Sequence, residues 1–150
     1  MAIQFPDIAT TTDSAPLEPL SAEEISRTSA LLREQRDLGP RVRFVSITLQ
    51  EPPKREVLDQ QRGDGAPLER AAFAVLYDRD AQQTIEAVAS LSSGVVTSWR
   101  VVEGVQPGVM LEEFFATEEI TRADARWQEA MRKRGVTDFS LAMIDPWAAG

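Results

Sequence analysis

The sequence predicts an α+β fold in which one helix packs on a four-stranded antiparallel sheet, followed by the start of a second unit of the same kind. Three observations predict it. Residues 71–102 contain three β-prone runs, and the breaks between them, Asp78-Arg79-Asp80 and Ser92-Ser93-Gly94, consist of residue types that turn a chain. An amphipathic stretch with a helix-capping signal at Ser21 precedes these runs. After residues 104–108, a pattern of helices followed by a strand begins again.

The first helix is expected to begin after Ser21 and to end at Gly39-Pro40. The Ser21 hydroxyl can accept from the amide of Glu24 while the Glu24 carboxylate reaches back, which makes a capping box. Glycine can adopt the left-handed conformation that closes a helix, and proline cannot continue one. One face carries the stripe expected to cover the sheet: Ile25, Thr28, Leu31, Leu32, Gln35 and Leu38.

The first strand is expected over residues 43–50, where apolar and polar residues alternate. Phe44 falls in the set expected to point away from the core. The set expected inside consists of Val45, Ile47 and Leu49.

The strand is followed by a break at Glu51-Pro52-Pro53. Residues 54–69 are rich in charge, and we expect them to form a loop with Gly63-Asp64-Gly65 at its tip.

The middle run of the three β-prone runs shows the clearest alternation. Thr84, Glu86 and Ser90 share one parity and are expected to face water. The opposite parity is expected to be buried and consists of Ile85, Ala87, Ala89 and Leu91. A sheet with one buried face needs a cover, which the first helix can supply. The arrangement of the first unit is therefore cystatin-like.

The second unit is expected to contain helices over residues 110–120 and 122–134 and a strand over residues 138–145. Thr121 with Asp124 gives a second capping signal, which predicts a break between the helices at Thr121. One strand of about eight residues cannot make a sheet. Either a partner supplies the remaining strands or the chain is a piece of a longer protein, and we favour the second explanation.

Composition and charge exclude several function classes. The chain has 150 residues, 43% of them hydrophobic, which is enough to bury a core in one domain or two small ones. A formal net charge of -8 repels phosphate backbones and anionic lipids, so neither nucleic acid nor a membrane is expected as a partner. No apolar run approaches the roughly 20 residues that span a bilayer, and the N-terminus lacks a secretory signal, so we expect a cytoplasmic location.

The inventory of reactive side chains is short. The chain has no cysteine and no histidine, which removes thiolate chemistry, the commonest general base and the commonest transition-metal ligand. Paired carboxylates have simpler explanations, since acids complement helix N-termini and flank turns. These pairs are Glu23-Glu24, Glu112-Glu113, Glu118-Glu119 and Asp78 with Asp80. We therefore expect no catalytic, cofactor-binding or metal-binding residue in this chain.

Two segments resemble one family. Residues 16–25, Pro-Leu-Glu-Pro-Leu-Ser-Ala-Glu-Glu-Ile, resemble the start of the first conserved N-terminal domain of copper-containing, topaquinone-dependent primary amine oxidases. Residues 127–135, 138–139 and 145–150 are similar to the second N-terminal domain of that family. The second resemblance is the more specific, because a helix end, a strand and a tryptophan-bearing exit occur together at the family's spacing.

Residues 1–18 are expected to be a flexible N-terminal tail, because residues 10–16 are polar and show neither a helical nor a strand period. The resemblance implies that residues 19–104 are an N2-like domain and residues 105–150 the first part of an N3-like domain, truncated midway. Both domains would be cystatin-like and would precede a large catalytic domain, which is the expected partner of this chain.

The family's chemistry cannot be carried over to these residues. The resemblance implies copper and topaquinone in the full-length enzyme, where three histidines hold the metal and a tyrosine in an Asn-Tyr-Asp/Glu sequence becomes the quinone. This chain has no histidine, and its one tyrosine, Tyr77, follows Leu76 rather than an asparagine. The chain alone is thus expected to hold no cofactor. It would be the non-catalytic region of an enzyme that oxidises primary amines to aldehydes, with release of ammonia and hydrogen peroxide.

A second hypothesis comes from a different class, a free-standing cystatin-like or helix-plus-meander module that binds or inhibits another protein. The pattern of one helix and a meander fits it, although the Gln-x-Val-x-Gly loop of cystatin-type inhibitors is absent. A homodimer is the other partner that we consider, because a second copy could pair with the edge of the incomplete unit.

Overall fold

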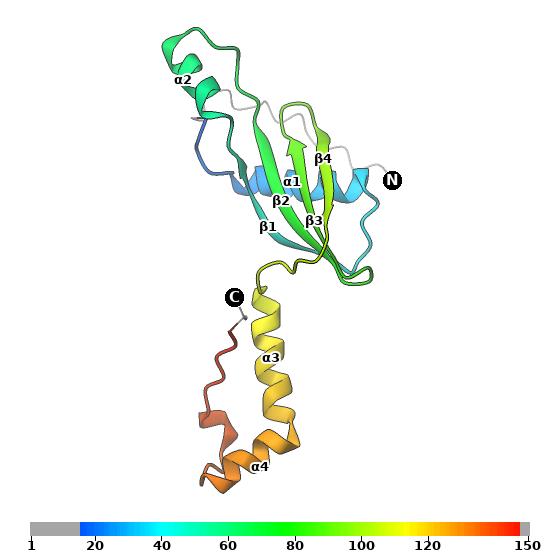
Figure 1. Cartoon of the computed structure of the whole chain (residues 1–150), viewed down its shortest axis with the longest axis vertical. Helices are drawn as coiled ribbons and strands as arrows, with labels where there is room; N and C mark the ends of the chain where they lie inside the picture. Colours follow the sequence, from blue (N-terminus) through cyan, green and yellow to red (C-terminus); the bar gives the residue numbers. More distant parts are fainter. Residues whose placement is uncertain (1–15, 148–150) are drawn as a thin grey trace. The chain divides into compact units, whose positions relative to one another are not determined.

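The structure is a computed structural model that describes residues 16–147 (Figure 1). The chain divides into two compact units, residues 1–107 and residues 108–150. The first unit contains α1 (Ala22–Gln35), β1 (Val42–Gln50), α2 (Lys54–Arg62), β2 (Ala71–Asp78), β3 (Gln83–Ser90) and β4 (Val95–Val102). The second unit contains α3 (Leu111–Ala123), α4 (Ala125–Lys133) and a short 3-10 helix, η1 (Phe139–Leu141). Most of the predicted tail, residues 1–18, lies outside the described residues.

The first unit has the predicted α+β architecture. Its sheet is antiparallel throughout, with the strands in the order β1-β2-β3-β4, and α1 lies across one face of it (Figure 1). β-Branched and aromatic residues suit these strands because they fit a pleated, half-buried surface. Consecutive strands are neighbours in the sheet, which is the simplest topology for a meander.

Helix α1 begins as the sequence predicts. Ser21 Oγ accepts from Glu24 N at 3.2 Å and Glu24 Oε2 accepts from Ser21 N at 2.8 Å, so the capping box is present. Thr28 and Leu32 are fully buried. The Thr28 hydroxyl donates to the carbonyl of Glu24 at 2.7 Å, so its burial leaves no unpaired polar group. The helix thus buries a narrow stripe against the sheet.

The core of the first unit lies between α1 and the sheet. The inward side chains of β2, Ala72, Ala74 and Leu76, have no exposed surface. Burial of each large aliphatic side chain contributes about 1.5–3 kcal/mol. The central cluster consists of Leu32, Val42, Ala74, Leu76, Ile85 and Ala87, with Leu38, Phe44, Ile47, Val96 and Trp99 packed against it.

Strand β1 differs from the prediction in its first half. The pairing with β2 shifts between Phe44 and Ser46, which leaves Val45 as a β-bulge. A bulge inserts one unpaired residue and so changes the alternation on either side of it. Phe44, predicted to point outward, therefore packs against the core together with the predicted inward residue Ile47. The sequence could not reveal the bulge, because Phe44 and Val45 are both apolar.

Strand β3 buries two polar residues that the sequence alternation wrongly assigns to the solvent-exposed face of the sheet. Thr84 and Ser90 are 5% and 0% exposed, and Glu86 is half-buried. Thr84 Oγ1 donates to the carbonyl of Val105 at 2.9 Å, and Ser90 Oγ accepts from Ser93 N at 3.0 Å. Chain segments at the two ends of the strand supply these partners, which a pattern within one strand cannot show.

The predicted charged loop after β1 contains a helix instead. α2 spans Lys54–Arg62 and ends at Gly63, whose φ of 84° is the left-handed cap conformation. The charged residues of this segment are also good helix formers, so charge alone does not separate a loop from an exposed helix. Gly65 then passes close to the helix, since a Cβ there would lie 2.7 Å from Gln60 N.

The second unit has its helix break later than predicted. α3 continues through Thr121, and Asp124 rather than Thr121 caps α4. Asp124 Oδ1 accepts from Arg126 N at 2.9 Å and from Trp127 N at 3.0 Å. A carboxylate is a stronger acceptor for free helix amides than a hydroxyl, which explains why the aspartate determines the corner.

The predicted strand over residues 138–145 is wrong. This segment begins with η1 and continues as chain without β pairing, and residues 108–147 contain no strand. Asp138 turns the chain because its Oδ1 accepts from Ser140 N at 3.0 Å. A strand needs backbone partners, and the described part of this unit supplies none.

Candidate functional site

The carboxylates around the β2–β3 turn have structural roles. Asp78 Oδ1 accepts from the amides of Asp80 and Ala81 at 2.9 and 3.1 Å, which closes the turn. Asp80 also forms an ion pair with Arg41 at 2.6 Å. These contacts explain both acids without a bound ligand.

Two carboxylates of α3 also contact their own helix. Glu113 Oε2 accepts from Met110 N at 2.9 Å, which caps the helix. Glu118 pairs with Arg122 at 2.7 Å, one turn further along. Both contacts stabilise the helix and indicate no acid–base chemistry.

An enclosed ion pair joins α1 to the start of β2. Arg70 Nε donates to Glu24 Oε1 at 2.8 Å and Nη2 donates to Oε2 at 3.0 Å, with the two side chains 14% and 27% exposed. Arg70 also donates to the carbonyls of Glu18 and Pro19. The hydrogen bond from Arg70 holds the pKa of the Glu24 carboxyl below its usual range, against a smaller opposing effect of burial. Because a carboxylate held this way is a poor proton acceptor, the pair is structural.

The donor chemistry of the chain does not fit a copper centre. The sequence has no histidine or cysteine, and within residues 16–147 no three acidic side chains gather as a ligand set. Copper in proteins is held by imidazole and sulfur ligands. Tyr77 is half-buried in β2, where it pairs across the sheet with Arg43 and Thr84, so it is a sheet residue.

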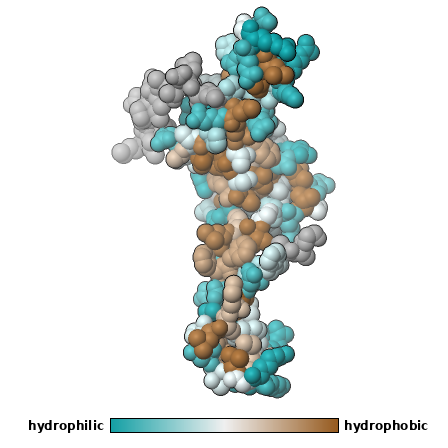
Figure 2. All heavy atoms as spheres, turned by 90° about the vertical axis from the view of Figure 1, so that its left-hand side faces the viewer, coloured by the Kyte–Doolittle hydropathy of each residue, from teal (hydrophilic) through white to brown (hydrophobic). Residues whose placement is uncertain are grey.

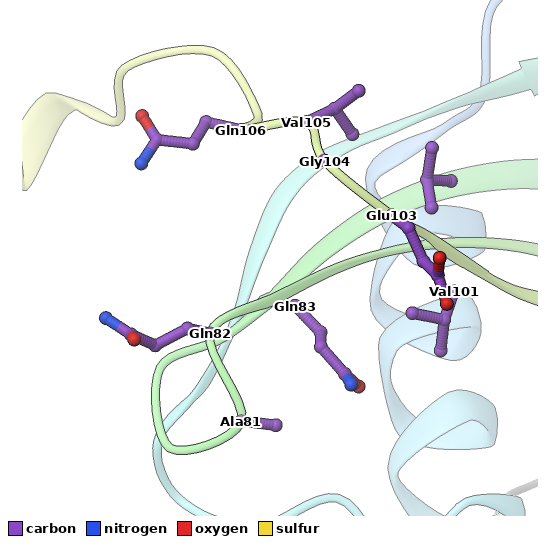
Figure 3. Close-up of a pocket in the computed structure, with 9 residues that line it drawn as sticks. Ala81, Gln82, Gln83, Val101, Glu103, Gly104, Val105 and Gln106 are labelled. Atoms are coloured by element: carbon purple, nitrogen blue, oxygen red, sulfur yellow. The ribbon is translucent and has the colours of Figure 1, made fainter.

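A hollow of about 420 Å³ opens at one end of the sheet of the first unit (Figure 3). The end of the β2–β3 turn and the start of β3, residues 81–83, line it together with the end of β4 and the segment that follows, residues 101–106. The hydrogen bond from Thr84 to Val105 holds that segment in place. The polar side chains that line the hollow are Gln82, Gln83, Glu103 and Gln106. Three amides and one carboxylate can bind a polar group but contain no nucleophile beside a base.

The second unit offers a different candidate, an exposed apolar surface. None of residues 108–147 is buried, and hydrophobic side chains lie at the surface of this unit in the lower part of Figure 2. A group of exposed apolar side chains on one unit is typical of a surface that binds another protein segment. The side chains that are more than half exposed are Leu111, Phe115, Ile120, Leu141, Met143 and Trp147.

Residues 141–147 carry part of this surface with a strand-like alternation. Ala142 and Ile144 are half-buried, and Arg122 Nη2 donates to the carbonyl of Ala142 at 2.9 Å. The alternate residues point away, as expected of an extended chain. They are Leu141, Met143 and Trp147, at 81%, 87% and 85% exposed. The segment thus has the side-chain period of a strand without a sheet to join.

Sequence reasoning misses the Glu24–Arg70 pair and the hollow. The two residues of the pair lie 46 positions apart, and the hollow joins two separate turns. Neither feature produces a local period or motif. The apolar surface of the second unit follows from the sequence, because its aromatic and aliphatic residues occur without a sheet to cover them.

Comparison with protein families finds a match to most of the first unit. The family model described as AGAO-like N2 domain matches residues 21–99, which is more than half of the chain.

Curated relatives extend over nearly the whole chain. A primary amine oxidase of Arthrobacter sp. (strain P1) is 41% identical over 138 residues, which cover 91% of this chain and 20% of that protein. A histamine oxidase of Arthrobacter globiformis is 34% identical, with 90% and 19% covered. A primary amine oxidase of Klebsiella aerogenes is 30% identical, with 90% and 18% covered. The chain spans about a fifth of the length of these relatives.

A solved structure has the same fold over most of the chain. The crystal structure of a copper-containing benzylamine oxidase from Hansenula polymorpha matches with a TM-score of 0.68, over 83% of this chain and 20% of that chain. At 21% sequence identity, this likeness concerns the fold alone.

Proposed function

Because the chain belongs to the AGAO-like N2 domain family of the amine oxidases, we propose that it is the non-catalytic N-terminal region of a copper-containing primary amine oxidase. The family match to residues 21–99 carries this proposal. The relatives support it, since the matching sequence forms only about a fifth of each enzyme. The side chains of residues 16–147 support it too, because in each of the four acid pairs at least one carboxylate has a structural contact.

The full enzyme would oxidise primary amines to aldehydes and release ammonia and hydrogen peroxide. Copper and topaquinone would be held outside this chain, since the chain has no imidazole to bind copper. The names of the relatives support copper, as with the copper methylamine oxidase of Arthrobacter sp. (strain P1).

The two units would have different structural tasks in that enzyme. We assign residues 19–104 to a self-supporting N2-like domain and residues 105–150 to the first part of an N3-like domain that later residues complete. The exposed apolar side chains of Leu141, Met143 and Trp147 support this assignment, because their alternation would suit a strand once later residues pair with this segment. The rest of the enzyme, including its catalytic domain, is the proposed partner.

The alternative of a free-standing binding or inhibitory module has less support, because the relatives carry this sequence within much longer enzymes. A cytoplasmic location stays a prediction. The helices described for this chain include none that is long and apolar enough to cross a bilayer. Related proteins include a diamine oxidase of Nicotiana tabacum named as peroxisomal.

Sequencing the DNA downstream of the Gly150 codon tests the proposal. We expect the reading frame to continue into a β-rich domain that contains three histidines and an Asn-Tyr-Asp/Glu sequence. A stop codon directly after Gly150 would contradict the proposal and favour the free-standing module.

The isolated chain should be inert towards amines and copper. We expect no amine-dependent release of hydrogen peroxide and no stoichiometric binding of Cu²⁺ in a calorimetric titration, because the chain lacks histidine and cysteine. The extended protein is the control: its copper-free form should bind Cu²⁺ stoichiometrically, and its copper-loaded form should release hydrogen peroxide when an amine is added. Tight binding of Cu²⁺ to the isolated chain would show that a metal site has been overlooked.

A further inference from the structure

Strand β4 is an edge of the sheet, and a side chain from α1 covers part of this edge. β4 ends the strand order β1-β2-β3-β4, as Figure 1 shows. Gln35, the last residue of α1, is exposed rather than buried in the helix stripe. Its Nε2 donates to the carbonyl of Gly94 at 2.9 Å, and its Oε1 accepts from Val96 N at 2.9 Å.

These two hydrogen bonds copy strand pairing. In a parallel ladder, the backbone N–H of one residue donates to a carbonyl of the neighbouring strand. Its backbone carbonyl accepts from the amide that lies two residues further along that same neighbouring strand. The planar carboxamide of Gln35 offers both groups, and it bonds to Gly94 and Val96 on either side of Val95. The side chain therefore stands in for one residue of a neighbouring strand at the N-terminal end of β4.

The sequence of β4 is suited to pairing with a second copy of itself. It reads Val-Val-Thr-Ser-Trp-Arg-Val-Val, with two valines at each end. In a two-fold antiparallel pair centred at Trp99, with the irregularity at Thr97 in each copy, Arg100 would oppose Ser98, so no like charges would be directly opposite. β-Branched residues directly opposite one another stabilise such a pair. The facing valines would be Val95 with Val102 and Val96 with Val101.

The valines that would oppose one another in this pair also lie on the same face of the sheet. Cross-strand partners share a face of the sheet. On the face that α1 covers, two valines pair with buried core residues: Val96 with Ala89 and Val101 with Ile85. On the other face the partners are Val95 with Ser90 and Val102 with Thr84. The irregularity at Thr97 produces this match, since the two ends of a regular eight-residue strand would point to opposite faces.

We propose that β4 is an edge able to bind a second copy of this chain, and that the Gln35 carboxamide seals it. An unprotected edge offers a row of free backbone groups to another chain, and proteins commonly block such edges. Gln35 occupies the carbonyl of Gly94, just before β4, and the amide of Val96 within it, both of which a second copy would need. Val95 and Val101, at 44% and 40% exposed, show that the side chains of this edge are accessible. The proposal does not depend on the amine oxidase role.

The test compares three variants of the 150-residue chain with the parent. Gln35→Ala removes both hydrogen bonds to β4. Gln50→Ala is the matched control, since Gln50 ends the opposite edge strand β1. Gln35→Ala combined with Ser98→Lys would place a lysine directly opposite Arg100 of the other copy, so two pairs of like charges would oppose the β4 pair. Circular dichroism establishes that each variant is folded, and Gln35→Met, which also lacks the carboxamide, replaces Gln35→Ala if that variant fails to fold.

Two readouts are needed, because the apolar surface of the second unit could also drive association. Sedimentation equilibrium gives the mass over a concentration series. Amide hydrogen exchange gives the protection of residues 97–102 over the same series.

We expect Gln35→Ala to shift from the monomer mass towards the dimer mass as concentration rises, with slower exchange across residues 97–102. The parent, Gln50→Ala and the double variant should show no such change in β4. The proposal is overturned if Gln35→Ala behaves like the parent, if the double variant still protects β4, or if the parent already does so.

Discussion

The two units of this chain have equally regular helices but differ in whether those helices bury anything. α1 has 14 residues and buries Thr28 and Leu32, whereas α3 has 13 residues and buries none. The difference lies in the sheet, which the first unit has and the described part of the second lacks. Capping and propensity determine where a helix forms, but packing of an apolar face supplies most of its stability in a protein.

The second unit is held by short-range contacts instead of a core. The rings of Trp127 and Phe139 meet edge to face with centroids 5.5 Å apart, and the Arg132 guanidinium lies 5.1 Å from the Phe139 centroid. Gln128 Nε2 donates to the carbonyl of Arg122 at 2.8 Å. Such contacts join neighbouring segments, and each contributes little by itself. Comparable substitutions should therefore change the free energy of unfolding by different amounts in the two units.

The largest effect is expected from the core of the first unit. Leu32→Ala removes a side chain with no exposed surface and should lower the free energy of unfolding by about 2–5 kcal/mol. Leu141→Ala in the second unit, where the side chain is 81% exposed, should change it by less than about 0.5 kcal/mol. Urea unfolding followed by circular dichroism measures both. Equal losses in the two variants would remove the proposed distinction between the units.

The next effect is expected at the ion pair that joins α1 to β2. Arg70→Met leaves the Glu24 carboxylate without its main donor and should cost about 1–3 kcal/mol of unfolding free energy. Arg100→Met is the matched control, because Arg100 pairs with Glu86 on β3 but is 65% exposed, and it should cost less than about 1 kcal/mol. A larger loss of unfolding free energy for Arg100→Met than for Arg70→Met would mean that burial does not determine how much these ion pairs stabilise the fold.

The same pair predicts a dependence on pH. The pKa of Glu24 is lowered in the folded protein, so its contribution is fully present above the unfolded value of 4.5 and is lost as pH falls through the folded pKa. The difference in unfolding free energy between the parent and Arg70→Met should therefore be constant near neutral pH and shrink below pH 4.5. Urea unfolding at about pH 7 and about pH 3 measures it. A difference that grows in acid would contradict the assignment.

The smallest effect is expected at the helix caps. Ser21→Ala removes the side-chain acceptor for Glu24 N and should cost about 1 kcal/mol in the first unit. Asp124→Ala removes the acceptor for two amides of α4 and should speed hydrogen exchange at those amides. It should leave the free energy of unfolding of the first unit unchanged. Amide hydrogen exchange on both variants is the measurement. A shift in the first unit caused by Asp124→Ala would show that the two units unfold together.

The elements that the sequence predicts correctly are those determined by local chemistry. The Ser21–Glu24 capping box and the turns of the meander are present, because their signals lie within four residues of one another. The sequence fails where a distant segment decides the outcome. Thr84 is buried because Val105 returns to it, and Arg70 meets Glu24 across 46 positions. Residues 138–145 are not a strand, although their alternation suits one, because no described residue pairs with them.

Amide hydrogen exchange of the isolated 150-residue chain, over a concentration series, tests the contrast between the units most directly. We expect slow exchange across residues 73–77 in β2, where each residue pairs with two neighbouring strands. Across residues 138–145 we expect fast exchange at low concentration, since these residues have neither a sheet nor a core. Slow, concentration-independent exchange in both segments would show that the second unit is complete by itself and would contradict this account.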